Sequence, residues 1–261
     1  MTGKVYLVGA GPGAPDLLTL RAARLLAKAD IVLHDALVHP ETLALAARAV
    51  KVAVGKRCGR HSSAQRFINK RLVDAASRYC TVVRLKGGDP TLFGRAQEEI
   101  AALEQAGIAF EVVPGVTAAL AAAAELGASL TQRGVARSVV FATPRVGEGE
   151  ARSGWAAAVA AADTAALYMG AGEAVRVRED LLASGVPADI PVALVESASL
   201  ESVRHAAGTL ADLETLAGGR GAGPVVILIG RVLQDAASRA SLEQQAAPVL
   251  ALAAARRAAR Q

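Results

Sequence analysis

One short segment constrains this chain more than any other: Val83-Arg84-Leu85-Lys86-Gly87-Gly88-Asp89-Pro90. A β-branched run typical of a strand passes directly into a lysine, two glycines, an acid and a proline. Glycines let the backbone approach a ligand closely or adopt a positive φ, and Pro90 fixes the direction in which the chain leaves. Because ligands of open α/β sheets lie outside the carboxyl ends of the strands, this strand end predicts a ligand site. Taken alone, the segment is equally compatible with a tight βα turn that binds nothing.

Short β-branched runs alternate with alanine- and leucine-rich stretches along the chain, which is the pattern of α/β sheets with crossover helices. The runs that we interpret as strands are residues 4–8, 30–33, 51–54, 81–85, 110–113, 138–141, 164–168, 192–196, 203–207 and 225–229. Pro114-Gly115 ends the first group, and an alanine-rich helix is expected over about 117–126. We therefore predict two α/β domains, residues 1–116 and 117–235, followed by an alanine- and arginine-rich tail at 236–261.

The charge of the chain favours anionic partners, since its formal net charge is +5 and its pI is about 9.6. Nucleic acid is not the expected partner, because aromatic residues make up only 3% of the chain and cannot supply stacking platforms. The basic residues are also scattered or placed at turns, without a single block or stripe. A small polyanionic substrate fits this composition better.

Neither a metal site nor a disulfide is expected. Cys58 and Cys80 form no C-x-x-C pair, and they form no cluster with the histidines at metal-ligand spacing. No apolar stretch approaches the ~18 residues that a membrane helix needs, and the N-terminus lacks a signal-peptide pattern. We therefore expect a cytoplasmic protein that does not enter the membrane.

The first turn, Gly9-Ala10-Gly11-Pro12-Gly13-Ala14, satisfies the G-x-G-x-x-A pattern of a dinucleotide-binding fold, and Asp35 lies where such a fold places its ribose acid. An NAD(P)-dependent oxidoreductase is therefore a serious alternative. Against it, Pro12 removes an amide N–H from the stretch that would bind pyrophosphate. Pro15 also delays the helix start, so that Asp16 offsets the helix dipole that a phosphate would use.

Five motifs in order carry a more specific resemblance: Gly9 to Leu20, Gly55-Lys56-Arg57-Cys58-Gly59-Arg60-His61, Arg84 to Pro90, Pro114-Gly115-Val116-Thr117-Ala118 and Tyr168-Met169-Gly170. Over residues 4 to 232 the chain resembles the uroporphyrinogen-III C-methyltransferases, within the tetrapyrrole methylases. It resembles their stand-alone form, without a dehydrogenase-chelatase module. The resemblance implies a mainly parallel N-terminal sheet, a mixed C-terminal sheet, S-adenosylmethionine in the cleft between the two domains, and a homodimer.

The resemblance also implies roles for individual residues. Asp35 corresponds to a proton acceptor and Lys56 to a proton donor. Four arginines in or beside the motifs are expected to hold the acetate and propionate groups of uroporphyrinogen III: Arg57, Arg60, Arg84 and Arg95. The expected cofactor contacts are Pro12, Gly87, Gly88, Asp89, Leu92, Thr117, Ala118, Met169 and Ala198.

The implied reaction is methylation of uroporphyrinogen III at C-2 and C-7 to give precorrin-2, for siroheme or cobalamin biosynthesis. A later precorrin methyltransferase is the alternative within the family, and a basic binding module without turnover is the non-enzymatic alternative. The chain departs from the family pattern at Ala14, His34, Ala96-Gln97, Thr143-Pro144-Arg145 and Ser197-Ala198-Ser199. These departures concern substrate fit and rate more than cofactor identity, and we interpret His34 as a polar packing residue.

Overall fold

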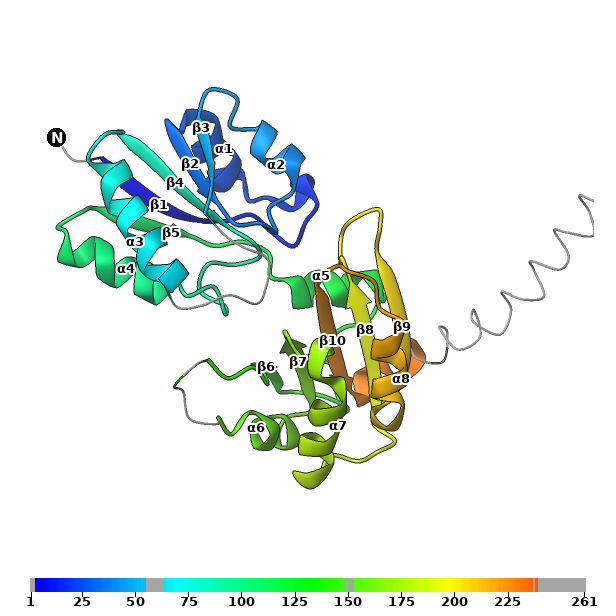
Figure 1. The fold of residues 1–261 in the computed structure, drawn as a ribbon. Coiled ribbons are helices and arrows are strands. Elements are labelled where there is room, and N and C mark those ends of the chain that lie inside the picture. The colour runs from blue at the N-terminus through cyan, green and yellow to red at the C-terminus, as the bar shows by residue number, and fades with distance from the viewer. Residues whose placement is uncertain (1–2, 55–62, 148, 150–152, 237, 239–261) are drawn as a thin grey trace, which may run out of the picture. The chain divides into compact units, whose positions relative to one another are not determined.

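The computed structural model describes residues 3–54, 63–147, 149, 153–236 and 238 (Figure 1). The chain divides into two compact units, Met1–Ala121 and Ala122–Gln261, and the division falls within helix α5 (Ala118–Glu125). Each unit contains a five-stranded sheet. The ten predicted strands are all present, with bounds shifted by no more than two residues.

The first sheet is entirely parallel. Its strands are β1 (Lys4–Gly9), β2 (Ile31–His34), β3 (Val50–Ala53), β4 (Thr81–Lys86) and β5 (Phe110–Val113). They are arranged in the order β3-β2-β4-β1-β5. Since all the strands run in one direction, their carboxyl ends meet at one edge of the sheet, and the motif glycines follow β1 and β4 at that edge.

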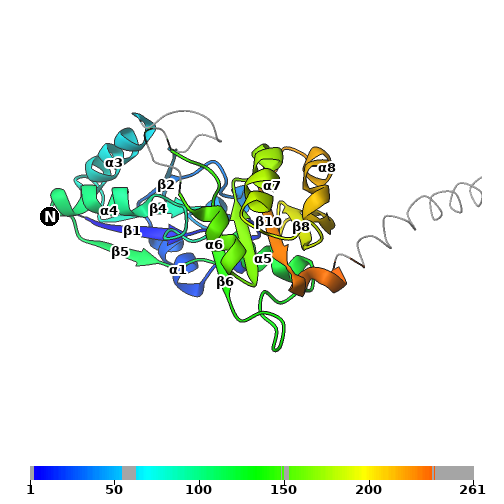
Figure 2. The same cartoon turned by 90° about the horizontal axis from the view of Figure 1, so that it is seen from below.

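Helices cover both faces of this sheet, and α1 and α3 lie on opposite sides of it in Figure 2. Residues of α1 (Leu20–Lys28) and the region of α2 (Pro40–Ala44) pack with Val8, Val83 and Leu85 in one core cluster. Residues of α3 (Ser63–Ala76) and α4 (Ala96–Gln105) pack with Val5 and Val82 in another. The two sets alternate along the strands, as side chains on a pleated sheet must.

This arrangement places a topological switch point between β1 and β4. The two strands are neighbours, yet β1 leads into the helices of one face and β4 leads into α4 on the other face. The connections after the two strands therefore diverge. A switch point of this kind is where open α/β sheets bind their ligands.

The second sheet is mixed, as expected. Its strands are β6 (Val139–Ala142), β7 (Thr164–Tyr168), β8 (Pro191–Glu196), β9 (Arg204–Thr209) and β10 (Val225–Gly230), in the order β6-β7-β10-β8-β9. Only β6 and β7 pair in parallel. Because β7 and β8 are both antiparallel to β10, they run in the same direction and end at the same edge of the sheet.

Three helices contribute to the main core of the second unit: α6 (Trp155–Ala161), α7 (Ala174–Ala183) and α8 (Leu213–Gly218). Four single 3-10 turns complete the described elements: η1 (Pro15–Leu17), η2 (Ala171–Glu173), η3 (Leu210–Asp212) and η4 (Arg231–Leu233). The described part of the chain has no helix with the length and hydropathy to cross a membrane. Apart from Ala236 and Ser238, the predicted tail lies outside the described residues.

Glycines bring three backbone segments of the first unit into direct contact. A Cβ atom on Gly9 would lie 2.6 Å from the backbone nitrogen of Gly115 and 2.7 Å from the carbonyl oxygen of Gly88. Neither distance is compatible with a side chain. The carboxyl ends of β1, β4 and β5 are therefore held together by a contact that only glycine permits.

We expect Gly9→Ala to destabilise the protein by about 2–3 kcal/mol, because the added methyl group must push backbone apart in a packed region. Chemical denaturation would measure the change. Gly218→Ala is the matched control, since a Cβ atom there meets nothing within 4 Å. Equal unfolding free energies for the two variants would contradict this account of the glycine contact.

Candidate active site

The turns after β1 and β4 are joined at the switch point by backbone hydrogen bonds. The N–H of Ala10 donates to the carbonyl oxygen of Lys86 at 2.7 Å. Gly11 and Gly88 exchange two hydrogen bonds, with N···O distances of 3.2 and 2.7 Å. Gly88 has a φ of +66°, and a Cβ atom there would find its nearest neighbour, the Cα atom of Thr117, at 4.0 Å. The backbone is thus fixed while the space beside Gly88 stays open.

The same hydrogen bonds count against a dinucleotide site in the first turn. A G-x-G-x-x-A turn binds pyrophosphate through free amide N–H groups at a helix N-terminus. Here the N–H groups of Ala10 and Gly11 are already bonded to Lys86 at the end of β4 and to Gly88 in the turn after it, and Pro12 has none. The next element is the three-residue turn η1, which carries Asp16, and the long helix begins only at Leu20.

Asp89 connects the turn after β4 to the turn after β5. One carboxylate oxygen, Oδ1, accepts the backbone N–H of Thr91 at 2.8 Å, and the other, Oδ2, accepts the N–H of Gly115 at 2.9 Å. Both oxygens therefore have donors within the protein. The predicted cofactor residues of this unit follow β1, β4 and β5 and occupy one edge of the sheet: Pro12, Gly87, Gly88, Asp89, Leu92, Thr117 and Ala118.

The remaining predicted cofactor residues, Met169 and Ala198, belong to the second unit and follow β7 and β8. Met169 has a φ of 60° and is 41% exposed, while Ala198 is buried between Ser197 and Ser199, whose φ values are 54° and 71°. Left-handed backbone costs a non-glycine residue about 1–2 kcal/mol. Such strain persists only where the surrounding structure imposes it, and it concentrates at functional sites.

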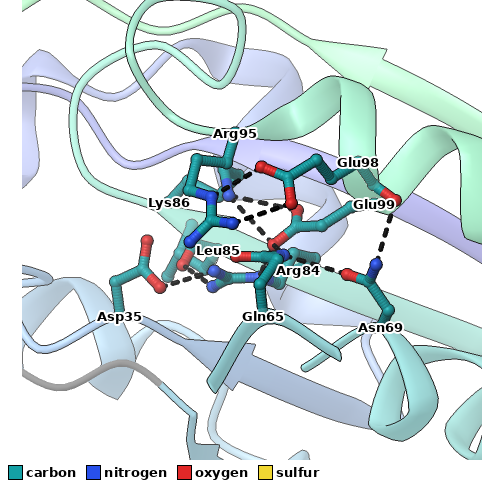
Figure 3. Close-up of polar contacts among 9 residues, drawn as sticks. All are labelled: Asp35, Gln65, Asn69, Arg84, Leu85, Lys86, Arg95, Glu98 and Glu99. Atoms are coloured by element: carbon teal, nitrogen blue, oxygen red, sulfur yellow. Dashed lines mark hydrogen bonds and ion pairs between the residues drawn. The ribbon is translucent and has the colours of Figure 1, made fainter. Parts of the chain in front are cut away.

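A cluster of buried charges lies beside the turn after β4 (Figure 3). Arg84 is 2% exposed and Glu99 is fully buried. The Arg84 Nε atom donates to Glu99 Oε1 at 2.9 Å, and its terminal NH2 group donates to Asp35 Oδ1 at 2.5 Å. Lys86 Nζ contacts both Glu99 oxygens, at 3.0 and 3.1 Å, and Gln65 adds an amide donor at 3.5 Å.

The alternation of side chains on the strands explains why these residues meet. Val83 and Leu85 face the α1 side, so Arg84 and Lys86 face α3 and α4, which carry Gln65 and Glu99. In the parallel register, Leu33 is opposite Arg84 and His34 is opposite Leu85. Asp35 therefore continues the same face, one residue past the end of β2. Two cations and two carboxylates share the site, so their formal charges balance.

Burial and the neighbouring Arg84 guanidinium both lower the pKa of Lys86 from its usual value, and Glu99 opposes them. This is the ordinary direction for a buried ammonium group. The charged form of Lys86 therefore depends on Glu99. An uncompensated buried charge is costly, which is why the cluster contains a carboxylate for each cation.

The structure gives two of the predicted arginines different environments. Arg84 is enclosed by protein carboxylates and contacts Asp35 directly. Arg95 is exposed at the start of α4, with a φ of 55° and a bidentate ion pair to Glu98. Lys56, Arg57 and Arg60 lie outside the described residues. The His34 ring Nδ1 lies 3.1 Å from the carbonyl oxygen of Asp35, as suits a polar packing residue.

Glu99, Gln65 and the role of Lys86 were not predicted from the sequence. One signal was available for Glu99. It lies between Ala96 and Leu103 at helical spacing, on the buried stripe of α4. An acid on such a stripe is rarely found without a buried cation. Among the residues that the structure describes, no group of three or more histidine, cysteine or acidic side chains could hold a metal ion.

The chain is similar to proteins of one known family. The profile of the tetrapyrrole (corrin/porphyrin) methylases matches residues 4–214. The siroheme synthase of Chromobacterium violaceum is 48% identical over 234 residues, which are 89% of this chain and 50% of that protein. The chain thus spans about half the length of that relative.

Two solved structures are similar over nearly their whole length. The uroporphyrin-III C-methyl transferase of Thermus thermophilus, complexed with S-adenyl homocysteine, matches with a TM-score of 0.75 and 40% identity, over 89% of this chain and 99% of that one. A cobalt precorrin-4 methyltransferase matches with a TM-score of 0.74 and 30% identity, over 88% and 95%. The predicted fold of two α/β domains is confirmed, and this chain belongs to the tetrapyrrole (corrin/porphyrin) methylase family.

Proposed function

We propose that this chain methylates uroporphyrinogen III at C-2 and C-7 with S-adenosylmethionine, giving precorrin-2 for siroheme or cobalamin biosynthesis. The similarity to uroporphyrin-III C-methyl transferase and to siroheme synthase supports this substrate. The lower identity to the cobalt precorrin-4 enzyme makes a later precorrin the weaker alternative. The proposal includes a cytoplasmic homodimer.

The observation that carries the proposal is the fixed position of Asp35. Arg84 holds its Oδ1 atom, and its backbone N–H donates to the carbonyl oxygen of Leu85 at 3.2 Å. Among the described residues, none donates a hydrogen bond to the other oxygen, Oδ2, and the side chain is 28% exposed. One oxygen is thus held by protein and the other is available to a ligand at the carboxyl edge of the sheet.

A carboxylate in this position suits the reaction. Methyl transfer converts a sulfonium cation to a neutral thioether, so a site chiefly has to align the pyrrole carbon with the methyl group and exclude water. The alkylated macrocycle then carries positive charge, which it loses by releasing a proton from carbon. We assign Asp35 as the acceptor of that proton and Lys56 as a proton donor.

The environments of the arginines refine their proposed roles. Arg57, Arg60 and Arg95 hold the acetate and propionate groups of the substrate in this proposal. Arg84 is buried, and its guanidinium is already bonded to Asp35 and Glu99. We therefore assign Arg84 to orienting Asp35.

The proposed function is tested directly by incubating the protein with uroporphyrinogen III and S-adenosylmethionine. The expected product carries two additional methyl groups by mass spectrometry. Turnover only of a more highly methylated precorrin would favour the alternative within the family, and no methyl transfer to any tetrapyrrole would refute the enzyme assignment.

Gly88→Ala tests the cofactor site. The methyl group would enter the open space beside Gly88, so we expect S-adenosylhomocysteine to bind at least about tenfold more weakly, which corresponds to about 1.4 kcal/mol. Calorimetric titration would measure the dissociation constant. Gly107→Ala is the matched control, because Gly107 has a φ of +65° against +66° for Gly88 and a Cβ atom there meets nothing within 4 Å. Equal affinities in the two variants would place the cofactor elsewhere.

Asp35→Asn tests the proton acceptor. Asparagine keeps an oxygen for Arg84 but cannot accept the proton, so we expect the rate of methyl transfer to fall by about 10²–10⁴-fold with S-adenosylhomocysteine affinity retained. Asp74→Asn, the same change at an exposed position of α3, is the control and should leave the rate unaltered. Parallel losses of cofactor binding and rate in Asp35→Asn would indicate a structural role instead.

The arginine assignment predicts a salt dependence. Raising salt from 0.1 to 1 M shortens the Debye length from ~10 to ~3 Å, so KM for uroporphyrinogen III should rise while cofactor affinity changes less. Arg60→Ala should raise KM at low salt and flatten this dependence. Arg24→Ala, at an exposed position of α1, should behave as the unaltered protein does. A KM that does not change with salt in the unaltered protein would show that these arginines are ordinary surface charges that do not hold the substrate.

A further inference from the structure

We propose that Glu99 is a positioning residue for methyl transfer: it fixes Arg84, which fixes Asp35, and it keeps Lys86 from competing for Asp35. The inference rests on the proposed function, since it assigns Asp35 as the proton acceptor. Glu99 itself touches neither substrate nor cofactor in this proposal, and it acts only through the two cations.

The contacts of Glu99 make it the centre of the cluster. Its Oε1 atom accepts from Arg84, Lys86 and Gln65, at 2.9, 3.0 and 3.5 Å, and its Oε2 atom accepts from Lys86 at 3.1 Å. These donors come from β4 and α3, while Glu99 belongs to α4. One fully buried carboxylate thus ties together three elements at the carboxyl edge of the sheet (Figure 3).

The Arg84 guanidinium is fixed at three points, and Glu99 is one of them. Nε donates to Glu99, NH1 donates to the carbonyl oxygen of Leu85 at 3.2 Å, and NH2 donates to Asp35. Because the guanidinium group is planar and its donors form a rigid fork, fixing two of its nitrogens determines the place of the third. The position of Asp35 Oδ1 is therefore set by Glu99 and the β4 backbone.

The charges assign a second task to Glu99. Asp35 is the other carboxylate whose charge acts on Lys86. Without the Glu99 charge, Lys86 and Arg84 would both be drawn to Asp35, in a buried region where ion pairs are weakly screened. Lys86 would displace Arg84 or engage the free oxygen of Asp35. Glu99 therefore keeps Oδ2 available for the proton that leaves carbon while the C–H electron pair returns to the macrocycle.

Loss of Glu99 should slow methyl transfer measurably, because a small displacement of a reacting group can lower the rate by about 10²-fold. Glu99→Gln keeps the shape of the side chain and removes its charge. We expect kcat per S-adenosylhomocysteine-binding site to fall by about 10²-fold, with the cofactor dissociation constant unchanged. Glu104→Gln, the same change at an exposed position of α4, is the control and should retain the unaltered kcat.

The double variant Lys86→Met/Glu99→Gln separates positioning from general damage. Removing Lys86 restores the balance of one cation and one carboxylate and removes the competitor for Asp35. We therefore expect the double variant to be about tenfold faster than Glu99→Gln alone, although it carries one more change. A residue that only stabilised the fold would make the double variant as slow or slower.

Each outcome is decisive. If the unaltered protein does not methylate uroporphyrinogen III, the proposed function fails, and this inference fails with it. If the unaltered protein is active and Glu99→Gln matches Glu104→Gln in kcat per binding site, or the double variant shows no recovery, this inference alone is overturned. Should Glu99→Gln not fold, Glu99→Asp keeps the charge but withdraws the carboxylate by one methylene. Its kcat should then fall by about tenfold at unchanged cofactor affinity, and an unchanged kcat would overturn the inference.

Discussion

The carboxyl edge of the first sheet depends on a contact among three glycines. Gly9, Gly88 and Gly115 end or follow neighbouring strands, and their backbones approach so closely that no Cβ atom fits on Gly9. Around this contact, the turn after β1 bonds to the turn after β4, and Asp89 bonds the turn after β4 to the turn after β5. Three connections that would otherwise be separate loops thus form one rigid platform. The open space beside Gly88 exists because the backbone around it cannot relax into it.

The charge cluster uses the same strand for a different purpose. Residues of β4 alternate between the apolar core on the α1 side and the buried charges on the α4 side. The strand that ends in the glycine turn therefore also holds Asp35 in place through Arg84. Since both features depend on β4, the glycine turn that we propose to bind the cofactor and the proposed proton acceptor are fixed relative to each other within the first unit.

Much of this could be predicted from the sequence, and the failures have a common cause. The ten strands were predicted because β-branched runs and glycine turns are local signals, and the parallel arrangement followed from their alternation with helices. The glycine turn after β4 was found in the same way. The charge cluster was not predicted, because Arg84 meets Asp35 through the register of β2 on β4 and meets Glu99 through the packing of α4 against that face. Taken singly, each resembles a surface charge in the sequence, and Arg84 was assigned to the substrate because it lies in one of the family motifs.

The first turn shows why a motif must be judged by the use of its backbone groups. Its letters satisfy a dinucleotide pattern, and it follows the first strand of a parallel sheet, as that pattern requires. A diphosphate needs amide N–H groups without partners, however, and here those of Ala10 and Gly11 bond to Lys86 at the end of β4 and to Gly88 in the turn after it. Glycine at these positions permits close contact between two backbones, and the cofactor site that we propose lies instead beside Gly88. Glycines at the same spacing can therefore serve either pyrophosphate binding or close contact between two backbone segments. The hydrogen bonds of the turn show that the second applies here.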